Sequence, residues 1–361
     1  MTTKAKSVEK TKMDSALEAV MGSMKTEFSD DDFSFANKMD YVSDLKWVTT
    51  GVYAINLALS GNPYKGVPYG RTISLVGDSG GGKSLLSQHI LRENQKLGGI
   101  SVLFDVERGI EMTQLEKIGI DTSKLVVSKA KILEDIFEKV IFFIKSIKKV
   151  SKNIPLTIVV DSISMACSRH EMEVGFDKAD MGRAKIIRQG LRMINTLVAD
   201  ENVCFIIINH QTSNVGVMYG PAKVVSGGTA VEYVPSIVVE VGKRKTIREG
   251  DTQDGRPLGL NVTISVKKTR LYIPFVKANV EIMFDRGFDQ CSGLFDVLVQ
   301  AGVVVNVSSG WWAFASDPTK KMRETEMNTI IDKDPEPVLK ALEKRPAEVP
   351  VSEIVLENDQ V

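Results

Sequence analysis

A glycine-rich loop between an apolar strand and a helix constrains this chain more than any other segment. The loop runs Gly77-Asp78-Ser79-Gly80-Gly81-Gly82-Lys83-Ser84 and fits G-x-x-x-x-G-K-[ST]. Residues 71–76 predict a buried strand before it, and residues 85–91 predict a helix after it. Glycines let the backbone turn its N–H groups toward phosphates, and the helix N-terminus adds partial positive charge. The segment therefore predicts a nucleoside-triphosphate site.

The residues of this loop have distinct expected roles. Lys83 is expected to reach the β- and γ-phosphates, and the Ser84 hydroxyl is expected to bind Mg²⁺. The remaining contacts to the nucleotide are expected from Gly77, Asp78, Ser79, Gly80, Gly81, Gly82 and Leu85.

The chain from about residue 48 to 209 alternates between predicted strands and helices. Short, β-branched apolar runs predict buried strands at residues 100–105, 156–161 and 204–209. Helices are predicted at residues 83–97, 132–149 and 182–199. This alternation predicts an α/β fold with a mainly parallel central sheet, whose ligand lies at the carboxyl ends of the strands. Later strands, joined by turn-rich segments, predict antiparallel additions at residues 237–241, 262–266 and 279–284.

The composition excludes several classes of protein. Lysine plus arginine and aspartate plus glutamate both number 46, so any nucleic-acid surface must be local. Three cysteines without a C-x-x-C pair argue against a disulfide framework or zinc site and for a reducing compartment. Because neither a secretory signal nor a long apolar run is found, the chain is expected in the cytoplasm and not in a membrane.

Polar residues at the ends of the predicted strands are candidates for chemistry. Asp161 closes an apolar strand, where its carboxylate would hold Mg²⁺ beside Ser84; the alternative is a helix cap. Glu107 lies two residues past another strand and is favoured over Asp105 as the group that deprotonates an attacking water. His210 follows a third strand and could contact the γ-phosphate, or be an ordinary hydrogen-bonded histidine.

Two polar, glycine-bearing segments, residues 168–182 and 211–228, are predicted loops. The helix after the first loop carries four basic residues, Arg183, Lys185, Arg188 and Arg192. The last three share one face at i, i+3 and i+7. Such a stripe can follow a phosphate backbone, although a solvated basic face is the simpler interpretation. A second basic cluster, residues 267–270, would on its own be interpreted as a solvated patch.

The two ends of the chain predict smaller units around a core at residues 48–285. Residues 1–47 contain a short amphipathic stripe formed by Leu17, Val20, Met21 and Met24. This stripe predicts a helix that packs on the body of the chain or, as we favour, on a neighbouring subunit. A small mixed module is predicted at residues 286–345, and an acidic disordered tail at residues 346–361.

Ordered motifs run through nearly the whole chain beside the phosphate loop. They lie at residues 48–51, 57–61, 104–107, 158–162, 180–184, 208–210, 216–220, 227–230 and 268–270. With them, residues 13–345 resemble the RecA-type homologous-recombination ATPases, and are most similar to phage recombinases of the UvsX type. Gly216-Val217-Met218-Tyr219-Gly220 and Gly227-Gly228-Thr229-Ala230 discriminate best, because other ATPases with this core lack them.

The resemblance implies a RecA-like P-loop ATPase core that binds ATP and Mg²⁺, with Glu107 as the catalytic carboxylate. His210 would stand where the cellular proteins have a glutamine that couples the γ-phosphate to DNA binding. Lys268 and Arg270 would reach the ATP of the adjacent subunit, so that ATP lies at the subunit interface of a filament. Gln114 occupies the position where the family places an aromatic side chain on the adenine.

The resemblance also implies a DNA site formed by the two predicted loops. The residues expected to contact single-stranded DNA are Met181, Gly182, Arg183, Lys185, Arg188, Val215, Gly227 and Gly228. The N-terminal helix would dock on the neighbouring subunit as an oligomerisation segment. Residues 286–345 would form a small C-terminal α+β domain, and the acidic tail would compete with DNA for basic surface.

The resulting hypothesis is a DNA-dependent ATPase that forms helical filaments on single-stranded DNA. It would promote pairing and strand exchange with a homologous duplex, in recombination and repair. Single-strand-binding and loader proteins are expected partners, and the expected location is the cytoplasm, the host's if a phage encodes the protein. The alternatives are a ring helicase with the same core and a DNA-coating filament with little turnover.

Overall fold

The structure is a computed structural model of the chain. It describes residues 15–24, 26–27, 45–175, 182–213, 223–225, 228 and 230–343. The predictions for Met181, Val215, Gly227 and the acidic tail lie outside these residues. The chain divides into two units, residues 1–45 and residues 46–361, and each is described by itself.

The first unit contains the predicted N-terminal helix. Residues 15–24 are helical, as the apolar stripe indicates. Leu17 and Val20 are 45% and 55% exposed, so this part of the stripe is open to solvent. Docking of the helix on a neighbouring subunit stays a prediction.

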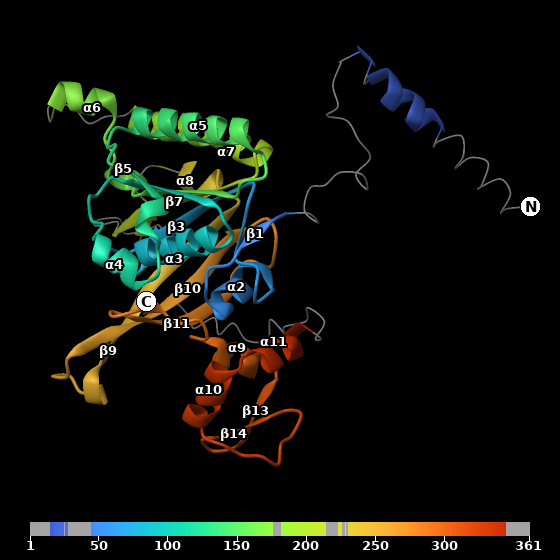
Figure 1. Cartoon of the computed structure of the whole chain (residues 1–361), viewed down its shortest axis with the longest axis vertical. Helices are drawn as coiled ribbons and strands as arrows, with labels where there is room; N and C mark the ends of the chain where they lie inside the picture. The colour runs from blue at the N-terminus through green and yellow to red at the C-terminus, as the bar shows by residue number, and fades with distance from the viewer. Residues whose placement is uncertain are drawn as a thin grey trace, which may run out of the picture. The chain divides into compact units, whose positions relative to one another are not determined.

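The second unit is built on a ten-stranded sheet with the order β12-β11-β10-β9-β3-β7-β6-β4-β5, in which β8 pairs with β7 (Figure 1). Six neighbouring strands are parallel: β9 (Ile237–Arg248), β3 (Arg71–Gly77), β7 (Val203–Ser213), β6 (Leu156–Asp161), β4 (Ile100–Asp105) and β5 (Leu125–Ser128). The antiparallel strands are β10 (Pro257–Thr269), β11 (Lys277–Met283), β12 (Gly287–Phe288) and β8 (Lys223–Val225). The α/β fold with a mainly parallel sheet is therefore confirmed.

One predicted strand direction is wrong. Residues 237–241 were expected to join the sheet antiparallel, but β9 pairs parallel with β3 and antiparallel only with β10. A parallel pair needs a crossover connection. The chain between β7 and β9, which includes the short helix α8 (Ala230–Tyr233), supplies it. The antiparallel addition therefore starts one strand later, at the hairpin between β9 and β10.

Helices cover both faces of the sheet, and each face has its own apolar cluster. Leu86, Ile90 and Leu91 of α3 (Lys83–Lys96) belong to one cluster. This cluster also holds apolar residues of α2 (Tyr53–Ser60), α4 (Met112–Lys117) and the small sheet of β1 (Trp47–Val48) and β2 (Val67–Pro68). On the other face, α5 (Leu133–Val150) and α7 (Arg183–Asp200) form the second cluster. The helix that follows the phosphate loop, α3, and the helix that carries the basic stripe, α7, therefore cover opposite faces of the sheet.

The close packing of α5 and α7 depends on a glycine. A Cβ on Gly190 of α7 would lie 2.2 Å from Cδ2 of Phe137 in α5. No real side chain tolerates that distance, because interior packing leaves no spare volume. Gly190 therefore permits the close approach of α7 to α5.

The C-terminal part of the chain surrounds a third apolar cluster. It contains α9 (Leu294–Gln300), β13 (Val304–Ser308), β14 (Trp311–Phe314), α10 (Glu324–Lys333) and α11 (Glu336–Glu343). Tyr53 of α2 belongs to the same cluster, and the Tyr64 hydroxyl donates to Glu336 Oε1 at 3.1 Å. The domain boundaries at residues 47, 285 and 345 stay predictions. Within the described ranges, no helix has the length and apolar character needed to cross a membrane.

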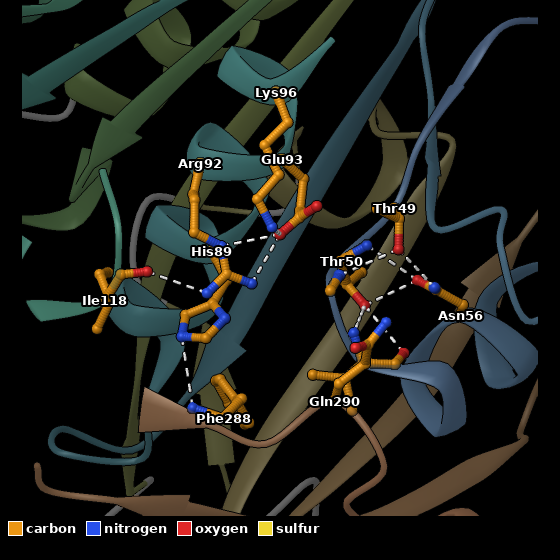
Figure 2. A network of polar contacts seen from close by, with 12 residues as sticks. Thr49, Thr50, Asn56, His89, Arg92, Glu93, Lys96, Ile118, Phe288 and Gln290 are labelled. Atoms are coloured by element: carbon orange, nitrogen blue, oxygen red, sulfur yellow. Dashed lines mark hydrogen bonds and ion pairs between the residues drawn. The ribbon is translucent and has the colours of Figure 1, made fainter. Parts of the chain in front are cut away.

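A buried histidine joins α3 to the last strand of the sheet (Figure 2). His89 has no exposed surface, and its Nε2 accepts a hydrogen bond from the Phe288 N–H at 3.4 Å. The two rings meet edge to face, with their centroids 5.3 Å apart. Burial, with the nearby cations Arg92 and Lys96, lowers the pKa of His89 to about 3. A neutral imidazole is therefore part of the native fold.

The neutral state of His89 makes the stability of the fold depend on pH. The folded-state pKa of about 3 lies below the ordinary value of 6.5, so this stabilisation is full above pH 6.5 and is lost as the pH falls toward 3. Between about pH 7 and about pH 5, the free energy of unfolding should drop by about 2 kcal/mol from this group. Urea titrations at both pH values measure that drop.

His89→Leu should show a correspondingly smaller drop between the two pH values, whatever its stability at pH 7. His170→Ala is the matched control, because His170 is exposed and its loss should leave the pH dependence as it is. Equal pH dependence in His89→Leu and the wild type would show that protonation of His89 does not oppose folding.

Candidate nucleotide-binding and catalytic site

The phosphate loop follows β3 and has a backbone that requires glycine. Gly77, Gly80 and Gly82 have φ values of 142°, 70° and 97°. A Cβ on Gly77 would lie 2.2 Å from the Val241 carbonyl oxygen, and one on Gly82 would lie 2.4 Å from Ile282 Cδ1. The loop is thus held by close contact with β9 and β11. All three glycines have positive φ values that side chains disfavour, and Gly77 and Gly82 also lack space for a Cβ.

Lys83 lies over this loop at the start of α3. It is 4% exposed, and its Nζ donates to the carbonyl oxygens of Gly77 at 2.9 Å and Asp78 at 2.7 Å. Burial lowers the pKa of Lys83, while the charges of Asp161, Glu107 and Asp78 oppose that effect. The ammonium group is therefore placed inside the loop, where phosphate oxygens can take the position of the carbonyls. The loop fits a triphosphate.

Ser84 and Asp161 lie side by side at the ends of α3 and β6. Burial raises the pKa of Asp161 to about 6, and a side-chain hydrogen bond with Ser84 works against the rise. Glu107 and Asp105 raise it further through their negative charges. A hydroxyl and a carboxylate are oxygen ligands that suit Mg²⁺, and a divalent ion would relieve the crowding of carboxylates. The donor set fits Mg²⁺.

Glu107 is held by two side chains at the edge of the sheet. Its Oε1 accepts hydrogen bonds from Ser162 Oγ at 2.5 Å and from His210 Nε2 at 2.8 Å. Burial raises the pKa of Glu107, but these hydrogen bonds and the charges of His210 and Lys83 outweigh it, so the pKa is lowered overall. Glu107 is thus a carboxylate, 37% exposed, beside the phosphate loop. Such a group can accept a proton from water.

Asp105, the alternative base, has a different position. It is 6% exposed at the end of β4, and its Oδ1 accepts the Gly109 N–H at 3.1 Å. This contact supports the loop that carries Glu107. The arrangement favours Glu107 as the base and Asp105 as a support.

His210 is near the end of β7, which runs directly beside β3. Gly77 and His210 are paired in the register of these two strands. The backbone N–H of His210 contacts Ser164 Oγ at 3.3 Å and Asn209 Oδ1 at 3.0 Å. Its ring contacts Glu107 from the strand next to the one that leads into the phosphate loop. The sequence analysis assigned no role to Ser162 and Ser164. Their position directly after Asp161 was the signal that could have indicated a part in the site.

The predicted DNA-binding residues are partly brought together. Lys185 and Arg188 are exposed on α7, and with Arg192 and Arg270 they line an open hollow of about 780 Å³. No carboxylate is among the described residues that line it. Gly228 has φ 81°, and a Cβ there would lie 3.2 Å from that of Ala184 at the start of α7. The last residue of the second predicted loop therefore lies beside the first turn of α7.

Three predicted residues have other surroundings. The Arg183 guanidinium donates to backbone carbonyls of the turn after β6. Lys268 Nζ donates to the carbonyls of Glu232 at 3.0 Å and Tyr233 at 2.7 Å, and burial lowers its pKa. Lys268 is thus fixed to α8, whereas Arg270 opens into the hollow. Gln114 is exposed on α4, and its contact with a base stays a prediction.

Comparison with known proteins agrees with this geometry. The family model of the RecA N-terminal domain matches residues 15–289. Protein RecA of Petrotoga mobilis is 32% identical over 276 residues, which cover 76% of this chain and 71% of that protein. Protein RecA of Geobacter metallireducens is 26% identical over 316 residues, 87% of this chain and 89% of that protein. Protein RecA of Brucella suis is 28% identical over 327 residues, which cover 90% of this chain and 86% of that protein. Because the family match includes the phosphate loop, Glu107, Asp161, His210 and Arg270, this chain belongs to the RecA family.

Proposed function

We propose that this protein is an ATPase stimulated by single-stranded DNA, which forms filaments on that DNA and promotes strand exchange with a homologous duplex. The observation that carries the proposal is the contact between Glu107 and His210 at 2.8 Å. It joins a carboxylate at the nucleotide site to β7, which leads toward the predicted DNA segment at residues 211–228. The state of the nucleotide and the binding of DNA then depend on the same pair of side chains.

The residues of the site divide the work of hydrolysis. Lys83 and the loop N–H groups bind the phosphates and neutralise their charge. Ser84 and Asp161 would hold Mg²⁺, which would supply further charge neutralisation to the triphosphate. Glu107 orients a water and takes its proton, and His210 lies where it can exchange Glu107 for a γ-phosphate oxygen.

The basic hollow supports the DNA and filament parts of the proposal. Lys185 and Arg188 provide cations for a phosphate backbone, and Gly228 lies beside Ala184 of the same helix. Arg270 adds a further cation, and the described residues that line the hollow include no carboxylate. We assign it to the triphosphate of the adjacent subunit, with Lys268 as its fixed neighbour, so that turnover requires assembly.

Addition of single-stranded DNA should raise ATP turnover by at least about tenfold, because filament contacts complete the site. The measurement is steady-state phosphate release with increasing single strand, followed by strand exchange with a homologous duplex. Heterologous duplex is the control for pairing. No stimulation at saturating single strand contradicts the proposal, unwinding without pairing indicates a helicase, and assembly without turnover indicates a coat protein.

Glu107→Gln should lower turnover by about 10²- to 10⁴-fold, since the amide cannot accept the proton from water. Binding of ATP and of single-stranded DNA should persist, because Lys83 and the phosphate loop are intact. Asp105→Asn is the matched comparison and should lose less activity, since its oxygen can still accept the Gly109 N–H. Retained hydrolysis in Glu107→Gln, with loss of hydrolysis in Asp105→Asn, would show that Asp105 is the group that accepts the proton from water.

Arg270→Ala and Lys83→Ala subunits should each lack DNA-stimulated turnover alone and recover part of it when mixed. A Lys83→Ala subunit still offers Arg270 to a neighbour whose phosphate loop is intact. The control replaces Lys83→Ala in the mixture with the double variant, which supplies no cation and should restore nothing. A mixture that co-assembles on DNA yet stays inactive would show that Arg270 does not act at the nucleotide site of the neighbouring subunit.

A further inference from the structure

The guanidinium of Arg183, which is partly buried, donates to backbone carbonyls of its own chain. Nε donates to the Ala166 carbonyl at 3.1 Å, and one terminal nitrogen donates to the carbonyls of Ile163 at 3.2 Å and Ser164 at 2.6 Å. These acceptors belong to the turn after β6, which contains the short 3₁₀ helix η3 (Ile163–Met165). The first residue of α7 is thereby tied to the chain that follows Asp161.

The same turn carries the hydroxyls that reach Glu107. Ser162 has no exposed surface, and its Oγ donates to Glu107 Oε1 at 2.5 Å. A hydroxyl has one proton to donate, so in the 2.9 Å contact between the two serines Ser164 must be the donor. Ser164 Oγ in turn accepts the His210 N–H at 3.3 Å. The carbonyl of Ser164 accepts from Arg183 and its hydroxyl donates to Ser162, so hydrogen bonds joined through the covalent frame of Ser164 lead from α7 to the carboxylate.

We propose that Arg183 is a positioning residue that couples α7 to Glu107 through Ser164 and Ser162, and that it does not contact nucleic acid. The proposal rests on the proposed function, in which Lys185 and Arg188 of the same helix bind DNA phosphates. Phosphates bound on α7 set the position of its first turn. Because Arg183 is bonded to the turn after β6, a shift of α7 also shifts that turn and, with it, Glu107. The route is separate from the one through the ring of His210.

The chemistry of the guanidinium suits this role. Its planar fork of donors bridges three carbonyls at once, and the geometry is rigid. A lysine presents its donors from a single nitrogen on a flexible stem and lacks this fixed fork. The donors already used on carbonyls are also not available to a phosphate, in contrast to those of Arg188, which is exposed in the hollow.

The experiment compares Arg183→Lys and Arg183→Ala with Arg188→Ala. For the Arg183 variants, kcat at saturating single-stranded DNA should fall by about tenfold. KM for ATP should stay within about twofold, and DNA affinity and its salt dependence should not change. Arg188→Ala should instead bind DNA more weakly, with the salt slope reduced by about one. Arg183→Lys keeps a cationic side chain, so a fall in its kcat is not a general loss of charge.

A double-mutant cycle tests the route. Ser164→Ala should lower kcat as Arg183→Ala does, and the double variant should be no worse than the poorer single variant, because both break one series of contacts. Additive losses overturn the proposal, as does an Arg183→Ala variant with a reduced salt slope and normal kcat at saturating DNA.

Hydrogen exchange without DNA separates this proposal from the proposed function. Arg183→Ala should speed amide exchange in residues 162–166 and also in residues 105–109, and Arg188→Ala should not. Unchanged exchange at residues 105–109 overturns the coupling, even when single-stranded DNA stimulates the wild type. Absence of stimulation in the wild type contradicts the proposed function, and the exchange result still decides whether Arg183 positions Glu107.

Discussion

The parallel hydrogen-bond ladder through β3, β7, β6 and β4 is the constraint on which the site depends. It places Gly77 opposite His210 and Asp105 opposite Asp161, so the strand ends share one edge of the sheet. Groups separated by long stretches of sequence then come within hydrogen-bond distance without any dedicated binding module. A slip of one register position would turn these side chains to the other face. The apolar strand interiors, buried on both faces, hold the register.

Much of this arrangement follows from local sequence, and the remainder depends on tertiary contacts. The loop, α3 and the buried strands could be predicted because their signals are local, and strand ends pointed to Asp161, Glu107 and His210. The direction of β9 could not be predicted, because its pairing with β3 depends on a crossover connection that leaves no periodic signal in the sequence. The anchoring of Lys268 and Arg183 on carbonyls was equally out of reach. A cation in sequence gives no indication of whether carbonyls or solvent surround it.

Two groups of basic residues that lie far apart in the sequence line one hollow. Lys185, Arg188 and Arg192 of α7 and Arg270 after β10 line the same hollow, because α7 and the end of β10 lie on the same side of the unit. A DNA strand and a neighbouring nucleotide would then meet cations whose electrostatic fields overlap. Arg183, at the start of the same helix, connects that surface to the carboxylate by neutral backbone acceptors. Charge attraction and mechanical linkage are thus carried by different residues of one helix.

The contact between His89 and Phe288 bears on how the protein can be divided. A fragment that stops at the predicted core boundary, residue 285, would lack the strand whose N–H meets His89 and the close approach of Gly287 to the same ring. It would also lack the Gln290 carbonyl that accepts the Tyr53 N–H at 3.0 Å. The imidazole would be opened to water and free to ionise within the helix that begins at Lys83. The predicted boundary at residue 285 therefore cuts through contacts that continue as far as Gln290, at the start of the predicted C-terminal module.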